Sequence, residues 1–242
     1  MAYPPNGSGE RAWCYGAQSH RPFGTAAEFT VVPLDHIAAL PENVSPEQGA
    51  CLGIPGITAH RALHVGGDVM GRTVLVQGAG GAVGMCAVAL ARHAAARVIG
   101  TVRPPSEEPA ARRAGAHEVI LNDQGLVERV KALVPEGLDH VVEVAFGANI
   151  DADNEMLKMG GSIGAYATDN ATPKIPFWLM VFKNTRVFFL GERRFPCGSQ
   201  SLCNARFERG PAGWMDWVRD RREDSPCGDR TGARIGGASG AA

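Results

Sequence analysis

The segment TVLVQGAGGAVG at residues 73–84 restricts the possible folds of this chain more than any other segment. It opens with apolar and β-branched residues, as a buried strand does, and a dense run of glycines follows at once. The next residues, MCAVALARHAA (85–95), have helical character. Glycines let the backbone approach a pyrophosphate, and a helix N-terminus offers it unpaired N–H groups. The order strand, glycine turn, helix therefore predicts a dinucleotide site, with an ordinary strand-to-helix turn as the alternative.

Strands and helices alternate over residues 51–191. After the first strand and helix, we expect strands at 97–102, 118–122, 140–146, 162–167 and 186–191, and helices at 106–116, 125–134 and 175–184. Because the expected strands are nearly all apolar, they predict a parallel sheet covered on both faces. The fold class is therefore α/β, with a doubly wound six-stranded parallel sheet of the Rossmann type. Its ligand crevice is expected at the carboxyl ends of the strands, near the first strand.

The two ends of the chain differ from this pattern. Residues 1–50 predict a strand within 23–33, a short second strand, and a proline-bounded turn into a helix before residue 50. Residues 192–242 form an Arg-, Gly- and Cys-rich tail without a persistent helical or strand period, and we expect it to be irregular. Such a composition is typical of a GC-rich gene read out of frame, and a natural disordered tail is the alternative. The predicted domains are thus 1–50, 51–191 and 192–242.

The overall composition excludes several classes of partner. The net charge of −1 gives no electrostatic reason to expect a nucleic-acid partner. No run of about 18 apolar residues is present, so we expect no membrane span. The first residues lack the charged-then-apolar pattern of a signal peptide, which favours a cytoplasmic protein. The six cysteines include no CxxC pair and are expected to be free thiols.

The glycine turn and its flanking segments resemble one known superfamily. The turn contains Gly78-x-x-Gly81-x-x-Gly84, with an additional glycine at position 80. With the alanine-rich helix after it, the turn resembles the medium-chain dehydrogenase/reductase superfamily, in particular its zinc-independent quinone oxidoreductase branch, where the loop reads like GAAGGVG. Three further segments resemble that family in the same order, over about residues 10–190: GTAAEFTVVP (24–33), LGIPGITAHRAL (52–63) and RRAGAHEVI (112–120).

The chain departs from the family pattern at both ends. GERAW at 9–13, close to the start of the chain, is similar to the family's GDRVW segment. The tail at 192–242 occupies the part of the sequence in which the family completes both of its domains. The resemblance therefore implies a nearly complete nucleotide-binding sheet, with residues 1–50 as the remnant of a GroES-like β-rich catalytic domain. The implied function is NADPH-dependent hydride transfer to a quinone or an α,β-unsaturated carbonyl, without zinc. The alternative is a catalytically inactive, truncated homologue that only binds a dinucleotide.

The residues after 97–102 bear on the choice of cofactor. NAD sites usually carry an acid at the end of the second strand, and here Arg103 follows instead. An arginine can pair with a 2′-phosphate through its planar fork, although a solvated loop arginine is the alternative. Glu107 stands where the quinone oxidoreductase branch often has a lysine, which argues in the other direction. We predict NADP(H) in preference to NAD(H).

Further site residues follow from the resemblance alone. Thr58 corresponds to a threonine near the nicotinamide, Asn122 and Ala145 to positions along the adenosine and ribose, and Ala165 and Tyr166 to positions beside the nicotinamide ribose. For each of these, an ordinary structural position is the alternative. For Tyr166, packing on the cofactor is favoured, donating a proton is the alternative, and no catalytic residue is assigned. The predicted cofactor-binding set is Thr58, Gly78, Gly81, Ala82, Val83, Gly84, Thr101, Arg103, Asn122, Ala145, Ala165 and Tyr166.

Metal binding and self-association complete the expectations. His60 and His64 are four residues apart on one predicted helix face, but no third ligand accompanies them, so we predict no metal site. The sixth strand (186–191) is very apolar for a sheet edge, and an exposed edge of this kind favours pairing with another chain. The family resemblance implies a homodimer joined across this strand, with a small molecule as the substrate.

Overall fold

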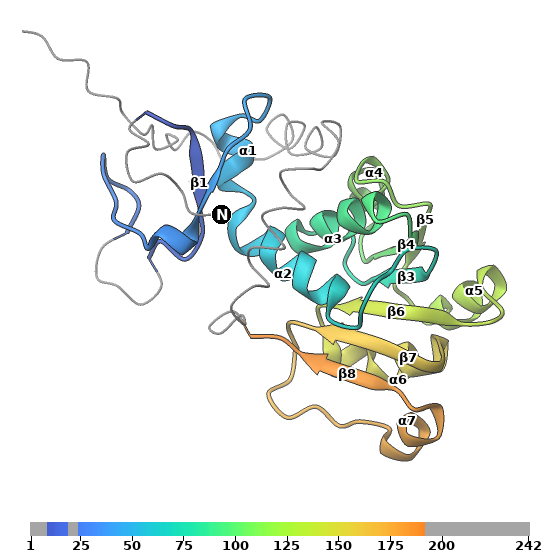
Figure 1. Cartoon of the computed structure of the whole chain (residues 1–242). Helices are drawn as coiled ribbons and strands as arrows, with labels where there is room; N and C mark the ends of the chain where they lie inside the picture. Colours follow the sequence, from blue (N-terminus) through green and yellow to red (C-terminus); the bar gives the residue numbers. More distant parts are fainter. Residues whose placement is uncertain (1–8, 19–23, 192–242) are drawn as a thin grey trace, which may run out of the picture. The chain divides into compact units, whose positions relative to one another are not determined.

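The computed structural model describes residues 9–18 and 24–191 (Figure 1). These residues belong to two compact units, which divide between Ile54 and Pro55. The predicted irregular tail at 192–242 lies outside the described residues.

The first unit contains a short antiparallel pair of strands and a capped helix. Strand β1 (Ala12–Cys14) pairs with β2 (Ile37–Ala39), directly after the 3₁₀ turn η1 (Leu34–His36). Helix α1 (Pro46–Ala50) has Ser45 as its N-cap. The Ser45 hydroxyl accepts the Gln48 N–H at 3.2 Å, and the Gln48 side chain accepts the Ser45 N–H at 2.7 Å. This reciprocal capping box, with proline at the first position, is why the helix begins at the predicted turn.

The strand predicted within 23–33 is not formed, so that prediction was wrong. Residues 24–33 have no strand conformation, and the side chains of Phe29 and Val31 are 77% and 84% exposed. Aromatic and β-branched residues favour a strand when they pack on a neighbouring strand. Here these side chains face solvent, so the composition of the segment does not determine its conformation.

The second unit is built on a six-stranded parallel sheet in the order β5-β4-β3-β6-β7-β8. Its strands are β3 (Thr73–Val76), β4 (Arg97–Val102), β5 (Glu118–Leu121), β6 (Leu138–Glu143), β7 (Leu157–Ala165) and β8 (Arg186–Phe189). Its helical segments are α2 (Gly53–His64), α3 (Ala82–His93), η2 (Pro105–Glu107), α4 (Glu108–Arg113), α5 (Leu126–Leu133), α6 (Phe146–Met156) and α7 (Phe177–Lys183). The strand order reverses between β3 and β6, so the predicted doubly wound topology is confirmed.

Both faces of this sheet are covered. Leu75, Val141 and Ile163 belong to one apolar core, which includes residues of α5 and α6. Val74 and Val76, the neighbours of Leu75 in the same strand, are also fully buried. Since successive side chains of a strand point to opposite faces, the sheet is buried on both sides, as its apolar strands predicted.

Several predicted boundaries differ from the structure by a few residues, and two strands differ most. The strand expected at 140–146 begins at Leu138 and ends at Glu143, because α6 already begins at Phe146. The strand expected at 162–167 begins earlier, at Leu157. The run HVVEVAF is apolar over most of its length, and hydrophobicity alone does not separate a buried strand from the buried start of a helix.

A buried histidine fastens α2 to the sheet. Nε2 of His140 lies 2.8 Å from the Ala62 carbonyl oxygen, to which it donates, and Nδ1 lies 2.8 Å from the Ser162 hydroxyl. Burial lowers the pKa of His140 to about 4, so the ring is neutral at neutral pH. A β-carbon on Gly164 would lie 2.3 Å from the Ala62 carbonyl oxygen. The backbone of α2 therefore lies directly on β7, at a distance that only glycine permits.

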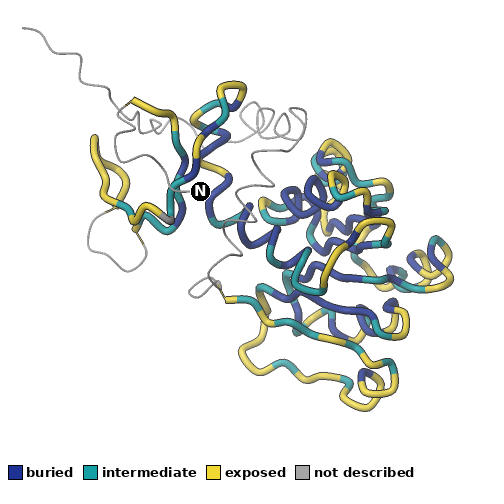
Figure 2. The backbone as a smooth tube through the Cα atoms, in the orientation of Figure 1, coloured by how far each residue is buried: buried dark blue, intermediate teal, exposed yellow. Residues whose placement is uncertain are grey.

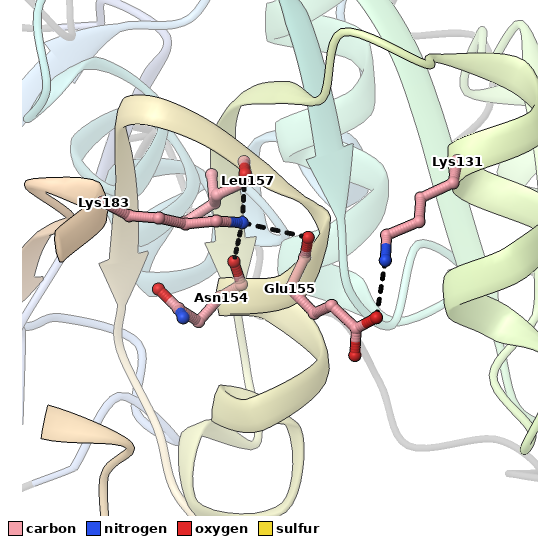
Figure 3. A network of polar contacts seen from close by, with 5 residues as sticks. All are labelled: Lys131, Asn154, Glu155, Leu157 and Lys183. Atoms are coloured by element: carbon pink, nitrogen blue, oxygen red, sulfur yellow. Dashed lines mark hydrogen bonds and ion pairs between the residues drawn. The ribbon is translucent and has the colours of Figure 1, made fainter. Parts of the chain in front are cut away.

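A lysine joins α7 to the end of α6 (Figure 3). Nζ of Lys183 donates to the carbonyl oxygens of Asn154, Glu155 and Leu157, at 2.7, 3.1 and 2.7 Å. These carbonyls lie at the C-terminus of α6, where helical partners are lacking and a positive charge is favoured. Glu155 also pairs with Lys131 at 2.5 Å. The contacts of Lys183 hold the segment that leads directly into β8.

The surface of α7 is unusually apolar. Phe177, Trp178, Leu179 and Phe182 are each more than half exposed. Most of the α7 backbone accordingly has the colour of exposed residues in Figure 2. Phe189 on β8, the outermost strand beyond β7, is 71% exposed. Among the described helices, none has the length and apolar character needed to cross a membrane.

Candidate dinucleotide site

The glycine turn is attached to the end of the neighbouring strand. Gly78, directly after β3 and Gln77, has a φ of +66°, a conformation that side-chain-bearing residues rarely adopt. Its N–H donates to the Thr101 hydroxyl at 3.2 Å, and the Ala79 N–H donates to the Thr101 carbonyl at 2.7 Å. The end of β4 thus fixes the first two residues of the glycine turn.

The first turn of α3 touches the backbone of the same loop. A β-carbon on Gly84 would lie 2.1 Å from the Gly78 carbonyl oxygen and 2.8 Å from the carbon of that carbonyl. Displacing backbone atoms that are held in a strand-to-helix turn costs free energy, because the surrounding protein is closely packed. The close approach of α3 to the strand end therefore requires glycine at position 84.

The N-terminus of α3 has no side-chain cap. Gly81 is the N-cap residue, and no side-chain hydrogen bond closes the helix there. Ala82 is exposed and Val83 is partly exposed. Backbone N–H groups of a first turn that lack such a cap fit an anionic group, which the helix dipole also favours. The turn brings together five of the predicted residues, namely Gly78, Gly81, Ala82, Val83 and Gly84.

A network of buried polar side chains surrounds Gln77, the residue directly before the glycine turn. Oε1 of Gln77 accepts from the Thr101 hydroxyl at 2.6 Å and from Nδ2 of Asn122 at 3.3 Å. Nε2 of Gln77 donates to Oδ1 of Asp153 at 2.8 Å. The Thr101 and Asn122 side chains, predicted as cofactor contacts, thus also bond to the protein; their contact with a cofactor stays a prediction.

The network ends in a pair of buried carboxyl groups. Glu143, fully buried, accepts from the Ala145 N–H and from Nδ2 of Asn149, the latter at 3.0 Å. Asp153 is also fully buried beside it. Burial, the Glu143 charge and a hydrogen bond to Glu143 together raise the pKa of Asp153 well above its usual range. A proton held on Asp153 and donated to Glu143 resolves the repulsion between the two groups.

Sequence reasoning missed Gln77, Glu143 and Asp153. Two of them gave a usable signal, because Gln77 ends the apolar run TVLVQ and Glu143 interrupts HVVEVAF. A polar side chain within a strand buried on both faces needs a partner inside the protein. Asp153 gave no such signal, since acidic residues are common in helices.

Of the remaining predicted residues, Thr58 and Ala165 lie on α2 and β7, and the others lie in segments next to a helix or strand. Thr58 of α2 is buried, and its hydroxyl has no hydrogen-bond partner among the described residues. Ala145 directly precedes α6, and its N–H is used by Glu143. Ala165 ends β7 and is buried. Arg103, directly after β4, is exposed. A buried hydroxyl without a partner is rare in proteins, so a ligand atom at Thr58 would complete its bonding.

Tyr166 follows β7, and its N–H donates to the Glu143 carbonyl at 3.1 Å. Burial, followed by the negative charge of Glu143, raises the pKa of its phenol. A phenol with a raised pKa releases its proton less readily, so these surroundings do not suit a proton donor. Of the two roles considered for Tyr166, packing remains favoured.

The two histidines of α2 lie side by side, with ring centroids 4.9 Å apart for His60 and His64. Within residues 9–18 and 24–191, no group of three His, Cys, Asp or Glu side chains is arranged to hold a metal ion.

A doubly wound parallel sheet with a tight glycine turn after its central strand defines a Rossmann-type domain. The sequence profile of the family described as "Zinc-binding dehydrogenase" matches residues 82–202. The quinone oxidoreductase of Mus musculus is 35% identical over 160 residues, which make up 64% of this chain and 47% of that protein. The L-threonine 3-dehydrogenase of Legionella pneumophila (strain Corby) is 33% identical over 185 residues, 73% of this chain and 53% of that protein.

Among solved structures, the quinone oxidoreductase from Thermus thermophilus, described together with its NADPH complex, has a TM-score of 0.65 and 30% identity. That match covers 77% of this chain and 60% of the other. The chain belongs to the zinc-binding dehydrogenase family, in the quinone oxidoreductase-like branch of the medium-chain dehydrogenase/reductases. It spans about half the length of the curated relatives that it matches.

Proposed function

We propose that this chain binds NADP(H) at the glycine turn and takes part in zinc-independent hydride transfer to a quinone or an α,β-unsaturated carbonyl. The observation that carries the proposal is the close contact between Gly84 and Gly78, which sets the uncapped start of α3 against the end of β3. The likeness to quinone oxidoreductases, one of them described with NADPH, supports it.

Most of the predicted residues have a proposed part in binding the dinucleotide. The N–H groups at the start of α3, from Ala82 to Gly84, hold the pyrophosphate. Arg103 pairs with the 2′-phosphate, and the buried Thr58 hydroxyl meets the nicotinamide end. Asn122, Ala145, Ala165 and Tyr166 border the adenosine and the two riboses. When bound, the nicotinamide supplies the hydride, and the chain's own residues orient the dinucleotide and shield it from water.

The second candidate function is binding of the dinucleotide without turnover. It requires only the glycine turn and the uncapped start of α3, both of which lie within the described residues. NADPH oxidation with 9,10-phenanthrenequinone or a simple enone, measured beside a binding titration, separates the two. Binding with turnover supports the reductase, binding alone supports the second candidate, and the absence of binding contradicts both.

Cofactor preference depends on Arg103 in this proposal. Replacing Arg103 with alanine is expected to weaken NADPH binding by roughly tenfold, because a charge-assisted contact to the 2′-phosphate is lost. NADH binding should change little. Fluorescence titration measures both affinities. Arg186→Ala is the matched control, because Arg186 is the first residue of β8 and the first residues of parallel strands lie far from their carboxyl ends, where the site is proposed. Equal affinities for NADPH and NADH in the unaltered protein would contradict the preference.

We also propose a homodimer that pairs β8 of two copies. The exposed Phe189 and the apolar surface of α7 support it, since an open apolar strand edge favours pairing with another chain. Sedimentation velocity at micromolar concentration should give a dimer, and Phe189→Glu should shift it toward the monomer. A monomer in the unaltered protein would refute this assembly.

A further inference from the structure

Glu107 lies directly against the glycine turn. This residue ends η2, in the segment that follows β4, and it is partly buried. The position of a β-carbon on Gly80 would be 2.5 Å from Cβ of Glu107 and 3.1 Å from its Oε2. Gly80 itself is buried. The absence of a side chain at Gly80 is thus what allows a carboxylate to lie over the middle of the turn.

The neighbouring acid does not share this position. Glu108 forms an ion pair with Arg112 at 2.7 Å, one helical turn further along α4. Its charge is therefore compensated within α4, while the Glu107 carboxylate faces the turn. Arg103, the cation at the end of β4, is exposed. The segment after β4 thus carries two residues of opposite charge, Arg103 and Glu107, of which Glu107 contacts the turn.

A carboxylate at an anion-binding turn opposes the binding of phosphate. The repulsion acts on the pyrophosphate common to both nicotinamide dinucleotides, and it grows with the further charge of about −2 that a 2′-phosphate carries. We propose that Glu107 is a specificity-determining residue that weakens dinucleotide binding here, and weakens binding of the 2′-phosphorylated form most. This inference rests on the proposed binding of a dinucleotide. Arg103 and Glu107 together then set the ratio of the affinities for NADPH and NADH.

Glu107→Gln, Glu107→Lys and the matched control Glu108→Gln test this role. Glu107→Gln is expected to tighten NADPH binding by roughly threefold to tenfold, the range for partly screened charges, and NADH binding by less. Glu107→Lys should tighten NADPH binding further. Glu108→Gln should leave the ratio of the two affinities unchanged. Added salt should reduce the gain of the Glu107→Gln variant, because the repulsion that it removes is screened.

The outcomes separate this inference from the proposed function. If the unaltered protein binds both dinucleotides and the Glu107 variants leave their affinity ratio unchanged, dinucleotide binding stands and the role of Glu107 is refuted. Weaker binding of either dinucleotide by Glu107→Gln also refutes it. If the unaltered protein binds neither but Glu107→Lys binds NADPH, the inference is supported. If no variant binds either dinucleotide, both proposals fail.

Discussion

Glu143→Gln is expected to destabilise the second unit strongly at neutral pH, whereas Asp153→Asn is expected to be tolerated. Glu143 only accepts hydrogen bonds, from the Ala145 N–H, from Asn149 and from the protonated Asp153. A glutamine keeps an acceptor at only one of the two carboxylate positions and places an N–H donor at the other, against the Asn149 amide or the Asp153 hydroxyl, at a cost of about 3 kcal/mol. Asparagine at position 153 keeps both bonds, since its oxygen accepts from Gln77 and its amide donates to Glu143.

The stability difference between the unaltered protein and Asp153→Asn should depend on pH. The pKa of Asp153 in the folded protein is raised well above 3.8, by burial and by the Glu143 charge. A raised acid pKa gives a contribution that is complete below the unfolded pKa and is lost as pH rises through the folded pKa. Asparagine does not titrate. The free energy of unfolding of Asp153→Asn should therefore increase relative to that of the unaltered protein as the pH rises.

Urea unfolding followed by circular dichroism, at about pH 6 and about pH 9, measures both effects. The two variants serve as controls for each other, because each replaces one carboxyl of the same pair by its amide. Equal losses in the two variants would show that Asp153 does not hold the proton. A Glu143→Gln protein as stable as the unaltered one would refute the arrangement altogether.

Gly84→Ala is expected to reduce dinucleotide affinity by roughly tenfold to 100-fold, because overpacking of about 1–3 kcal/mol would act on the turn that receives the dinucleotide. Its β-carbon would lie 2.1 Å from the Gly78 carbonyl oxygen, so α3 or the turn must move. The same movement should cost about 1–3 kcal/mol of stability, as overpacking does. Isothermal titration with NADPH measures the first effect, and thermal unfolding without cofactor measures the second.

Gly81→Ala is the matched control in the same turn. Its β-carbon would lie 3.3 Å from the same oxygen, and the φ of Gly81, −78°, suits alanine. It should retain much more of the affinity than Gly84→Ala. If Gly84→Ala binds NADPH as well as the unaltered protein does, the turn does not receive the dinucleotide in the way proposed.

The sheet could be predicted from the sequence because its strands carry a strong local signal. RVIGTV at 97–102 coincides with β4, since a short segment rich in apolar and β-branched residues between two helices favours a buried strand. Residues 24–33 show the limit of this reasoning. Their β-prone composition specifies a strand only together with a neighbouring strand, and the side chains of Phe29 and Val31 face solvent instead.

The candidate site could be predicted in part. Gly78, Gly81 and Gly84 were found because a tight turn constrains residues close together in sequence. The support of the turn was not found, because Gln77 bonds to Thr101, Asn122 and Asp153, which are 24, 45 and 76 residues away. Only the fold brings such residues together, and a single sequence carries no local pattern for them.

The edge strand β8 is attached to the rest of the second unit partly through a charged side chain, that of Lys183. The central strands are held largely by buried apolar side chains on both faces. The segment before β8 is held by one protonated amine that satisfies three backbone oxygens. A reagent that acylates this amine would remove the charge and block its donors. We expect this change to loosen the segment before β8, which contains Lys183, while leaving the glycine turn after β3 unaltered.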